Sequence, residues 1–199
     1  MIQELISTSA DAWVVEERIL SSPREFLKGG AYRPSIHLHA RLLDRSAAAD
    51  PDFEVKVEVS PARILEGEEA TTHIRSTRDA RIYFLALYPG GGELVLPNEN
   101  RPNTFVRAHR SLVFPSDADK LRGVRLIGTL PAGFSHSVES VLVLAMRGDR
   151  DHPELGELLG MDAAAEEAGL LVSKFLVPLI DLPPDDWALA QTSYEVFSR

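Results

Sequence analysis

Two histidines separated by one residue are the pattern in this chain best suited to holding a metal ion. His37 and His39 lie in a segment that alternates between apolar and polar residues. Residues two apart on a strand point to the same face, so both imidazoles could bind one zinc ion. A third ligand would have to come from His73, Asp44 or Glu58 through folding. A metal-dependent hydrolase is therefore one hypothesis, while a hydrated strand face is the favoured interpretation.

The serine-containing run Gly133–Ser137 superficially resembles the nucleophile elbow of hydrolases. The second glycine of that motif is missing, and no predicted helix follows to hold the turn. A serine nucleophile also needs a base that a third group orients. A structural turn is the favoured interpretation, and the sequence predicts no catalytic residue and no cofactor. The absence of cysteine excludes thiol catalysis, disulfides and cysteine-based metal sites.

The polar loop Pro97–Asn103 is the segment best suited to contacting a ligand or partner. Its side-chain amides and charges come from Asn98, Glu99, Asn100, Arg101 and Asn103. Such loops bind peptides, sugars or calcium, but a calcium loop usually has several carboxylates and this one has only Glu99. Asn and Pro are also ordinary turn residues, so a structural loop is the favoured interpretation. These five residues are nevertheless the predicted contact region.

Three further patterns have structural interpretations. The run Gly90–Gly92 lacks the Gly-Lys-Ser or Gly-Lys-Thr of a phosphate-binding loop, so it predicts a hairpin turn. The carboxylates of the run 66–69 predict a hydrated turn at the rim of a sheet. Trp187 and Phe197 are expected to seal the core beside a closing strand.

The net charge and the lengths of the apolar segments limit which partners are possible. The chain of 199 residues has a formal net charge of -9, which opposes binding to nucleic acid or anionic lipid. The most apolar window, Leu170–Ile180, is about half as long as a membrane helix and contains Lys174 and Pro178. The N-terminus lacks the basic and apolar regions of a signal peptide. We therefore expect no membrane span, and either a cytoplasmic protein or a chain without its leader.

The elements that would position these residues fall into two parts. In residues 1–45 the pattern predicts a helix over Ile2–Ala12, a helix or strand over Trp13–Leu20, and a strand over Tyr32–Leu42. The small polar segment 46–52 predicts a linker. Residues 53–199 are expected to form the main domain.

The main domain is predicted to be mainly β. Alternating or wholly apolar runs separated by Pro and Gly turns predict strands: Phe53–Val59, Thr71–Thr77, Arg81–Tyr88, Leu94–Leu96, Phe105–Ala108, Ser111–Phe114, Val124–Gly128, Val138–Met146 and Ser193–Phe197. Arg81–Tyr88 is apolar on both faces, which is typical of a central strand, and it should form a hairpin with Leu94–Leu96. One or two C-terminal helices are expected, the clearest over Asp162–Val177 with Asp162 as N-cap. The fold class is an antiparallel β-sandwich or a barrel-like domain, with a small N-terminal α/β element.

From Phe53 onward, a collinear series of short motifs resembles the bacterial family called domain of unknown function 4384. The motifs are Glu66-Gly67-Glu68, ARIYFLALYPGGGELVLPN, Val106-Arg107-Ala108, Val113-Phe114-Pro115, Leu130-Pro131-Ala132-Gly133 and the close from Trp187 through Phe197. They span roughly three quarters of the chain, and their order carries the resemblance. His109 stands where the family pattern has a glycine, so the loop there should differ. Before the linker, Tyr32 and the alternating residues after it resemble the last strand of a domain found in flagellar-assembly T proteins and small lipoproteins.

The resemblance implies a non-enzymatic protein-interaction or scaffold module in the bacterial envelope, either periplasmic or outer-membrane-associated. It implies an unidentified protein partner, association with envelope components and no known catalytic residues. The alternatives are the metal-dependent hydrolase with His37 and His39, and a cytoplasmic adaptor domain.

Overall fold

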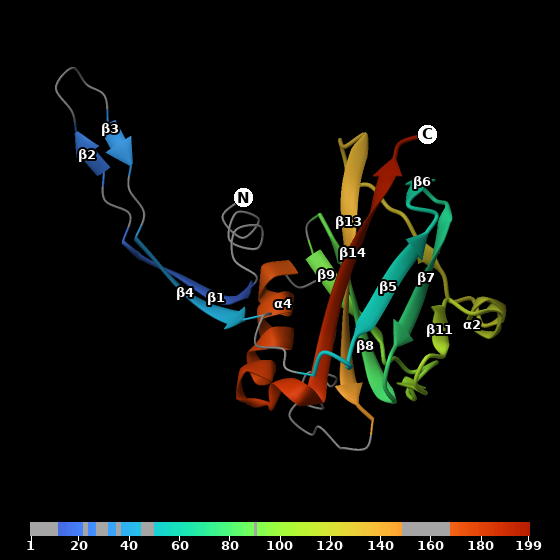
Figure 1. Ribbon diagram of the computed structural model, residues 1–199. Helices are drawn as coiled ribbons and strands as arrows, with labels where there is room; N and C mark the ends of the chain where they lie inside the picture. The colour runs from blue at the N-terminus through green and yellow to red at the C-terminus, as the bar shows by residue number, and fades with distance from the viewer. Residues whose placement is uncertain are drawn as a thin grey trace.

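Alternating burial along the strands organises the computed structural model, which describes residues 12–21, 24–26, 32–34, 37–44, 50–89, 91–148 and 168–199. For the ranges before residue 50 only the backbone is described. The architecture is mainly β, as the sequence predicts. Two sheets pack face to face, and a helix covers the outer face of the larger one (Figure 1).

The larger sheet is built on three long strands, β8 (Ala80–Tyr88), β13 (His136–Arg147) and β14 (Trp187–Phe197). Its order is β10-β8-β13-β14-β6, and β9 also pairs with β8. The shorter strands are β6 (Arg63–Leu65), β9 (Gly91–Leu96) and β10 (Phe105–Val106). The pairing of β8 with β9 confirms the predicted hairpin, and β9 begins earlier than expected, since Gly91 and Gly92 already pair with Tyr88 and Leu87. All pairs are antiparallel except β6 with β14, which is parallel.

The smaller sheet is centred on β7 (Glu69–Ser76), which pairs with β5 (Val55–Ser60), β11 (Ser111–Phe114) and β12 (Leu126–Ile127). A short helix, α2 (Asp117–Leu121), lies between β11 and β12 in the chain. Between β5 and β6 the chain crosses from the smaller to the larger sheet. The grouping of β5, β7 and β11 against β8, β13 and β14 follows the connectivity of immunoglobulin-type sandwiches.

Alternate side chains of both sheets fill the space between them. On β7 every second residue is buried, and Ile74 is fully enclosed. The rings of Phe84 and Phe114 meet edge to face across this interior, with centroids 5.8 Å apart. The sandwich core is therefore the product of the period-two pattern that the sequence shows.

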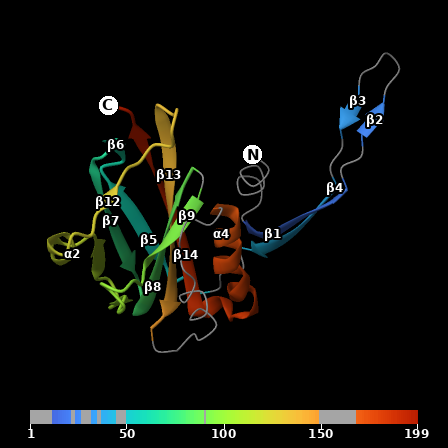
Figure 2. The same ribbon diagram turned by 180° about the vertical axis from the view of Figure 1, so that it is seen from behind.

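A second core lies on the other face of the larger sheet. Here α4 (Ala168–Leu176) and the 3-10 helix η1 (Val177–Asp181) cover Leu85, Leu142 and Leu144 (Figures 1 and 2). Strands β8 and β13 are thus buried on both faces, which confirms that the apolar run 81–88 is a central strand. A shorter 3-10 helix, η2 (Pro184–Asp186), leads into β14.

The N-terminal segments form a two-stranded ribbon. Strand β1 (Ala12–Ser21) pairs with β4 (His37–Asp44), and β2 (Arg24–Phe26) pairs with β3 (Tyr32–Pro34). Strand β1 lies against α4, and the far end of the ribbon extends away from the sandwich (Figures 1 and 2). The run 13–20 is therefore strand rather than helix.

Several sequence expectations need correction. The barrel-like alternative is wrong, because the two sheets stack as separate layers instead of closing on each other. The single strand expected over residues 32–42 is two strands with different partners, β3 and β4. The described part of the helix expected over Asp162–Val177 is α4 (Ala168–Leu176), and the expected N-cap Asp162 lies outside the described residues. Of the helix expected over Ile2–Ala12 only Ala12 is described, and it belongs to β1. Helix α2 was not expected.

The end of the predicted linker is attached to the sandwich. The Asp50 carboxylate lies 2.6 Å from a guanidinium nitrogen of Arg147, and Thr77 Oγ1 donates a hydrogen bond of 2.6 Å to the Asp52 carbonyl. Arg147 also stands over the Phe53 ring, 5.9 Å from its centroid. These contacts fix where the chain enters β5.

Shortening a side chain in the second core should destabilise the fold strongly. Leu144 is fully buried between the larger sheet and α4, so Leu144→Ala should lower the free energy of unfolding by about 2–5 kcal/mol through lost contacts and a cavity. Urea denaturation followed by circular dichroism measures this loss. Leu121→Ala is the matched control, because Leu121 is 89% exposed and its removal should change stability by less than about 0.5 kcal/mol.

Candidate functional site

The predicted histidine pair lies on the backbone of β4. In the β1–β4 register His37 stands opposite Ser21, and His39 stands opposite Arg18. Two positions apart on one strand, they belong to the same face of the ribbon. Their side chains lie outside the described residues. Within the part of the chain whose side chains are described, no three His, Asp or Glu residues group closely enough to hold a metal ion. The metal hypothesis stays a prediction.

The other proposed ligands lie in different places. His73 is an exposed residue of β7, with Glu58 of β5 opposite it in register. Asp44 is the last residue of β4 and stands opposite Ala12. Asp44 therefore lies on the N-terminal ribbon with the histidine pair, whereas His73 and Glu58 lie on the outer face of the smaller sheet.

The loop predicted to contact a partner closes one side of the sandwich instead. Asn98 Nδ2 donates a hydrogen bond of 2.8 Å to the Val95 carbonyl on β9, and Asn98 Oδ1 accepts one of 2.8 Å from the backbone N–H of Arg101. The Arg101 guanidinium donates to the Val113 carbonyl on β11 at 3.0 Å. Two of the five predicted contact residues thus join an edge strand of each sheet.

Arg101 also holds the helix α2 in place. Its guanidinium lies 3.1 Å from Oδ2 of Asp119, a buried carboxylate that also accepts hydrogen bonds from the Ser116 hydroxyl and backbone N–H at 2.7 and 2.9 Å. Burial by itself would raise the pKa of Asp119, but the hydrogen bonds from Ser116 and the positive charge of Arg101 lower it below its ordinary value. The carboxylate therefore stays ionised and completes the N-terminal capping box of α2.

The remaining predicted contact residues are exposed. Glu99, Asn100 and Asn103 lie on the surface, and the Asn103 side chain accepts a hydrogen bond of 3.0 Å from the Phe105 N–H. Arg122 donates to the Asn100 carbonyl at 3.1 Å. Among the five, the side chains of Glu99 and Asn100 take part in none of the hydrogen bonds described for this loop.

Removing the Arg101 side chain should destabilise the protein. Arg101→Ala would leave the buried Asp119 carboxylate without its cation and the Val113 carbonyl without its donor, at a cost of about 3 kcal/mol. Thermal and urea unfolding measure the loss. Glu99→Ala in the same loop should leave stability within about 0.5 kcal/mol. Equal stability of the two variants would contradict a structural role for Arg101.

The Gly133–Ser137 run forms a turn and the start of β13. The Phe134 N–H donates to the Pro131 carbonyl at 3.1 Å, and His136 is already in the strand. Ser137 is buried, and its hydroxyl has no hydrogen-bond partner among the described residues. Ser135, the serine at the nucleophile position of the motif, is exposed, and the ring of its neighbour His136 stacks on Phe197.

A buried carboxyl group, Glu139, lies in the sandwich core and was not singled out in the sequence. The Tyr194 hydroxyl donates to Glu139 Oε2, and the Thr129 N–H donates to Oε1 at 3.4 Å. Both side chains are at most 5% exposed. Burial raises the pKa of Glu139 more than these two hydrogen bonds lower it, and burial beside Glu139 raises the pKa of Tyr194. The sequence sign of this pair is a Glu that stands just before the apolar run Val141–Met146.

Stability should decrease as pH rises because of Glu139. A carboxyl group whose pKa is raised in the folded state binds its proton more tightly there than in the unfolded chain. Its contribution to the free energy of unfolding is therefore complete below the ordinary carboxyl pKa. It is lost as pH rises through the pKa of the folded state. Glu139→Gln, which is uncharged at every pH, should flatten the part of the profile that lies above the ordinary carboxyl pKa. Urea unfolding at several pH values measures the slope. An unchanged slope in the variant would show that Glu139 is not the titrating group.

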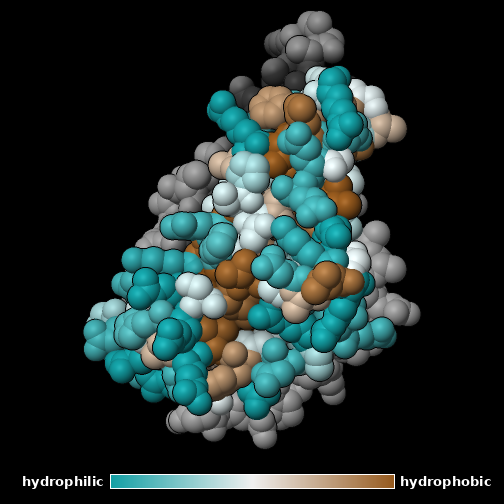
Figure 3. All heavy atoms as spheres, turned by 90° about the vertical axis from the view of Figure 1, so that its right-hand side faces the viewer, coloured by the Kyte–Doolittle hydropathy of each residue, from teal (hydrophilic) through white to brown (hydrophobic). Residues whose placement is uncertain are grey.

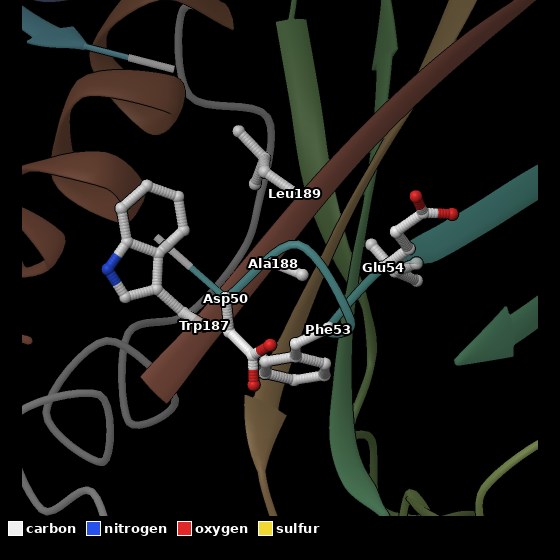
Figure 4. Close-up of a pocket in the computed structure, with 7 residues that line it drawn as sticks. Asp50, Phe53, Glu54, Trp187, Ala188 and Leu189 are labelled. Carbon is white, nitrogen blue, oxygen red and sulfur yellow. The ribbon is translucent and has the colours of Figure 1, made fainter. Parts of the chain in front are cut away.

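A small hollow of about 180 Å³ lies between the start of β5 and the start of β14 (Figure 4). Phe53, Trp187 and Leu189 supply apolar walls, and Asp50 and Glu54 supply carboxylates. Asp50 is already paired with Arg147, so its charge is matched within the protein. Trp187 is 4% exposed, which confirms that it seals the core. Its indole N–H has no partner among the described residues and points away from Phe53 and Glu54 (Figure 4).

The acidic run at 66–69 is more than a hydrated turn. Glu68 accepts a hydrogen bond of 2.9 Å from the Leu65 N–H, and its own N–H donates to the Leu65 carbonyl at 2.9 Å. Glu69 lies 2.7 Å from Arg125 and 3.7 Å from Lys120. Glu68 thus forms hydrogen bonds with the backbone of the edge strand β6, and Glu69 links β7 to the segment around α2 through ion pairs.

An apolar surface, here called the strand-end patch, lies where β6, β14 and β13 meet. It consists of Leu65, Phe134, His136, Val138 and Phe197. In register, Leu65, Phe197 and His136 stand side by side on the three strands, and Val138 follows in the next row. Leu65, Phe134 and Val138 are 41%, 59% and 51% exposed, which is high for large apolar side chains. Phe197 is only half-buried, so the expectation that it seals the core holds in part.

Contacts within the strand-end patch hold it in shape. The His136 ring stacks on Phe197 with centroids 4.7 Å apart, and its Nε2 lies 3.9 Å from Glu195. Glu195 is also 2.7 Å from Arg63. A shallow hollow of about 200 Å³ borders Leu65 and Phe197.

Comparisons with known proteins leave the sequence resemblance as a prediction. No family model matches the chain. A search of curated proteins gives no significant match either. Among the described residues, no helix is long and apolar enough to cross a membrane.

Proposed function

We propose that this chain is a non-enzymatic protein-interaction or scaffold module, and that the strand-end patch is its contact surface. The observation that carries the proposal is the exposure of three large apolar side chains at one end of the sandwich: Leu65 on β6, Val138 on β13 and Phe134 in the turn just before β13. Hydrophobic patches rimmed by charged residues are typical of protein interfaces, and aromatic residues are enriched at their centres.

The form of the edge strands supports side-chain contact rather than strand addition. Polar side chains occupy backbone groups on three edge strands: Glu68 on β6, Asn98 on β9 and Arg101 on β11. An incoming strand would have to displace these hydrogen bonds before it could pair. A partner would therefore bind through apolar side chains placed against the strand-end patch.

The envelope location is a proposal that rests on the sequence resemblance alone. A fractionation of the native cells, with the periplasm, membranes and cytoplasm separated, tests it directly. Recovery in the cytoplasmic fraction would favour the adaptor alternative.

Photo-crosslinking in the native cells tests the contact surface. A photoreactive phenylalanine analogue placed at Phe134 or Val138 should give a defined adduct, since these side chains would face the partner. The same analogue at Leu121 is the matched control, because Leu121 is 89% exposed and lies on α2, outside the strand-end patch. We expect the Leu65→Ser and Phe134→Ser double variant to remove the adduct formed at position 138.

The comparison of positions distinguishes a specific contact surface from nonspecific crosslinking of exposed residues. Identical adducts from positions 134 and 121 would mean that exposure alone explains the crosslinks. Absence of any adduct at positions 134 and 138, in a protein that folds normally, would reject the strand-end patch as a contact surface.

A further inference from the structure

Three arginine side chains form no ion pair and no hydrogen bond within the described part of the protein. Arg75, Arg107 and Arg110 are exposed, and none has an ion pair or a guanidinium hydrogen bond among the described residues. Nearby arginines are engaged: Arg78 lies 3.5 Å from Asp52, and Arg147 lies 2.6 Å from Asp50. In a chain of net charge -9, unpaired cations gathered at one place need an explanation.

Backbone contacts bring the three arginines to one corner of the smaller sheet. Arg75 lies near the end of β7 and stands opposite Ser111, the residue that follows Arg110. The Arg110 N–H donates to the Arg107 carbonyl at 3.0 Å, which closes the turn between β10 and β11. The His109 N–H donates to the Ser76 carbonyl at 2.8 Å, which folds this turn over the end of β7. We call the surface of Arg75, Arg107 and Arg110 the basic corner.

The turn of the basic corner is held rigidly. His109 has φ of 61°, the left-handed region that favours glycine and costs a residue with a side chain about 1 kcal/mol or more. Asp79 accepts a hydrogen bond of 2.7 Å from the Ala108 N–H in this turn. Its carboxylate therefore fixes the backbone of the turn, while the arginines on either side of Ala108 keep no carboxylate of their own.

We infer that the basic corner binds an acidic segment of a partner protein. Arginine presents a planar array of donors that matches a carboxylate with two hydrogen bonds, and three such groups on a rigid turn and strand would read spaced Asp or Glu side chains. The occupant is an extended acidic peptide rather than a membrane or nucleic acid. Repulsion from such large anionic surfaces acts on the whole chain of charge -9, whereas a short segment meets mainly the local cations.

This inference is independent of the strand-end patch. The patch lies at the start of β13 and the end of β14, whereas the basic corner lies on β7 and the turn before β11. Figure 3 shows the face that carries β7 and β11, where hydrophilic side chains lie on both sides of a band of hydrophobic ones. A module with both surfaces could hold an acidic segment while another part of the same or a second partner contacts the patch.

Binding of a fluorescent oligo-glutamate peptide tests the inference. Fluorescence anisotropy should show binding to the unaltered chain, weakening as salt is added because the contact is between exposed charges. The triple variant Arg75→Ala, Arg107→Ala and Arg110→Ala should bind at least about tenfold more weakly, since three charge-assisted contacts are lost. The triple change of the same residues to Lys keeps the charges but not the planar donors, and should fall between the two.

A charge-matched control separates a local site from a general effect of net charge. The triple variant Arg63→Ala, Arg125→Ala and Arg199→Ala removes the same number of cations elsewhere and should keep most of the binding. Equal loss in both triple variants would overturn the basic corner as a site, and so would absence of peptide binding to the unaltered chain. Binding of phosphatidylglycerol vesicles with the same dependence on Arg75, Arg107 and Arg110 would overturn the assignment to an acidic protein segment. Circular dichroism of each variant verifies that the exposed changes leave the fold intact.

Discussion

Burial of the larger sheet on both faces is the constraint on which the rest of the structure depends. Strands β8 and β13 place alternate side chains into two separate cores, one against the smaller sheet and one against α4. Apolar area is removed from water on each side, so these strands contribute more to stability than a strand with one face in solvent. The strand-end patch belongs to this doubly covered layer, and the basic corner lies on the smaller sheet that packs against it.

The polar side chains that looked most available for binding are used to finish the sandwich. Sheet edges expose backbone groups that invite pairing with another chain, and they are costly to bury without partners. In this protein Asn98, Arg101 and Glu68 occupy such groups on β9, β11 and β6. Arg101 links this edge protection to the cap of α2 through Asp119. A loop rich in amides can therefore have a structural role, in which its side chains hydrogen-bond to the edges of the two sheets.

The surfaces left for recognition are those where side chains remain without partners inside the fold. The strand-end patch exposes large apolar groups at a place where three strands end beyond the cover of α4. The basic corner exposes three arginines that no described carboxylate neutralises. Hydrophobic contact and charge complementarity act differently, since the first sets affinity and the second steers association and specificity. Two such surfaces on one rigid body are what a module that joins other proteins requires.

Local periodicity determined most of the fold, and long-range packing decided the rest. Alternation of apolar and polar residues was enough to predict β5, and runs that are apolar on both faces were enough to predict β8 and β13, because each strand's pattern is set by its own two faces. It was also enough to predict the β8–β9 hairpin, since a glycine turn is a local feature. The unpaired state of Arg75, Arg107 and Arg110, the buried meeting of Glu139 with Tyr194, and the internal use of Arg101 depend on residues far apart in the chain. A residue's type shows which bonds it is able to form, but only the tertiary structure brings it a partner or leaves it exposed.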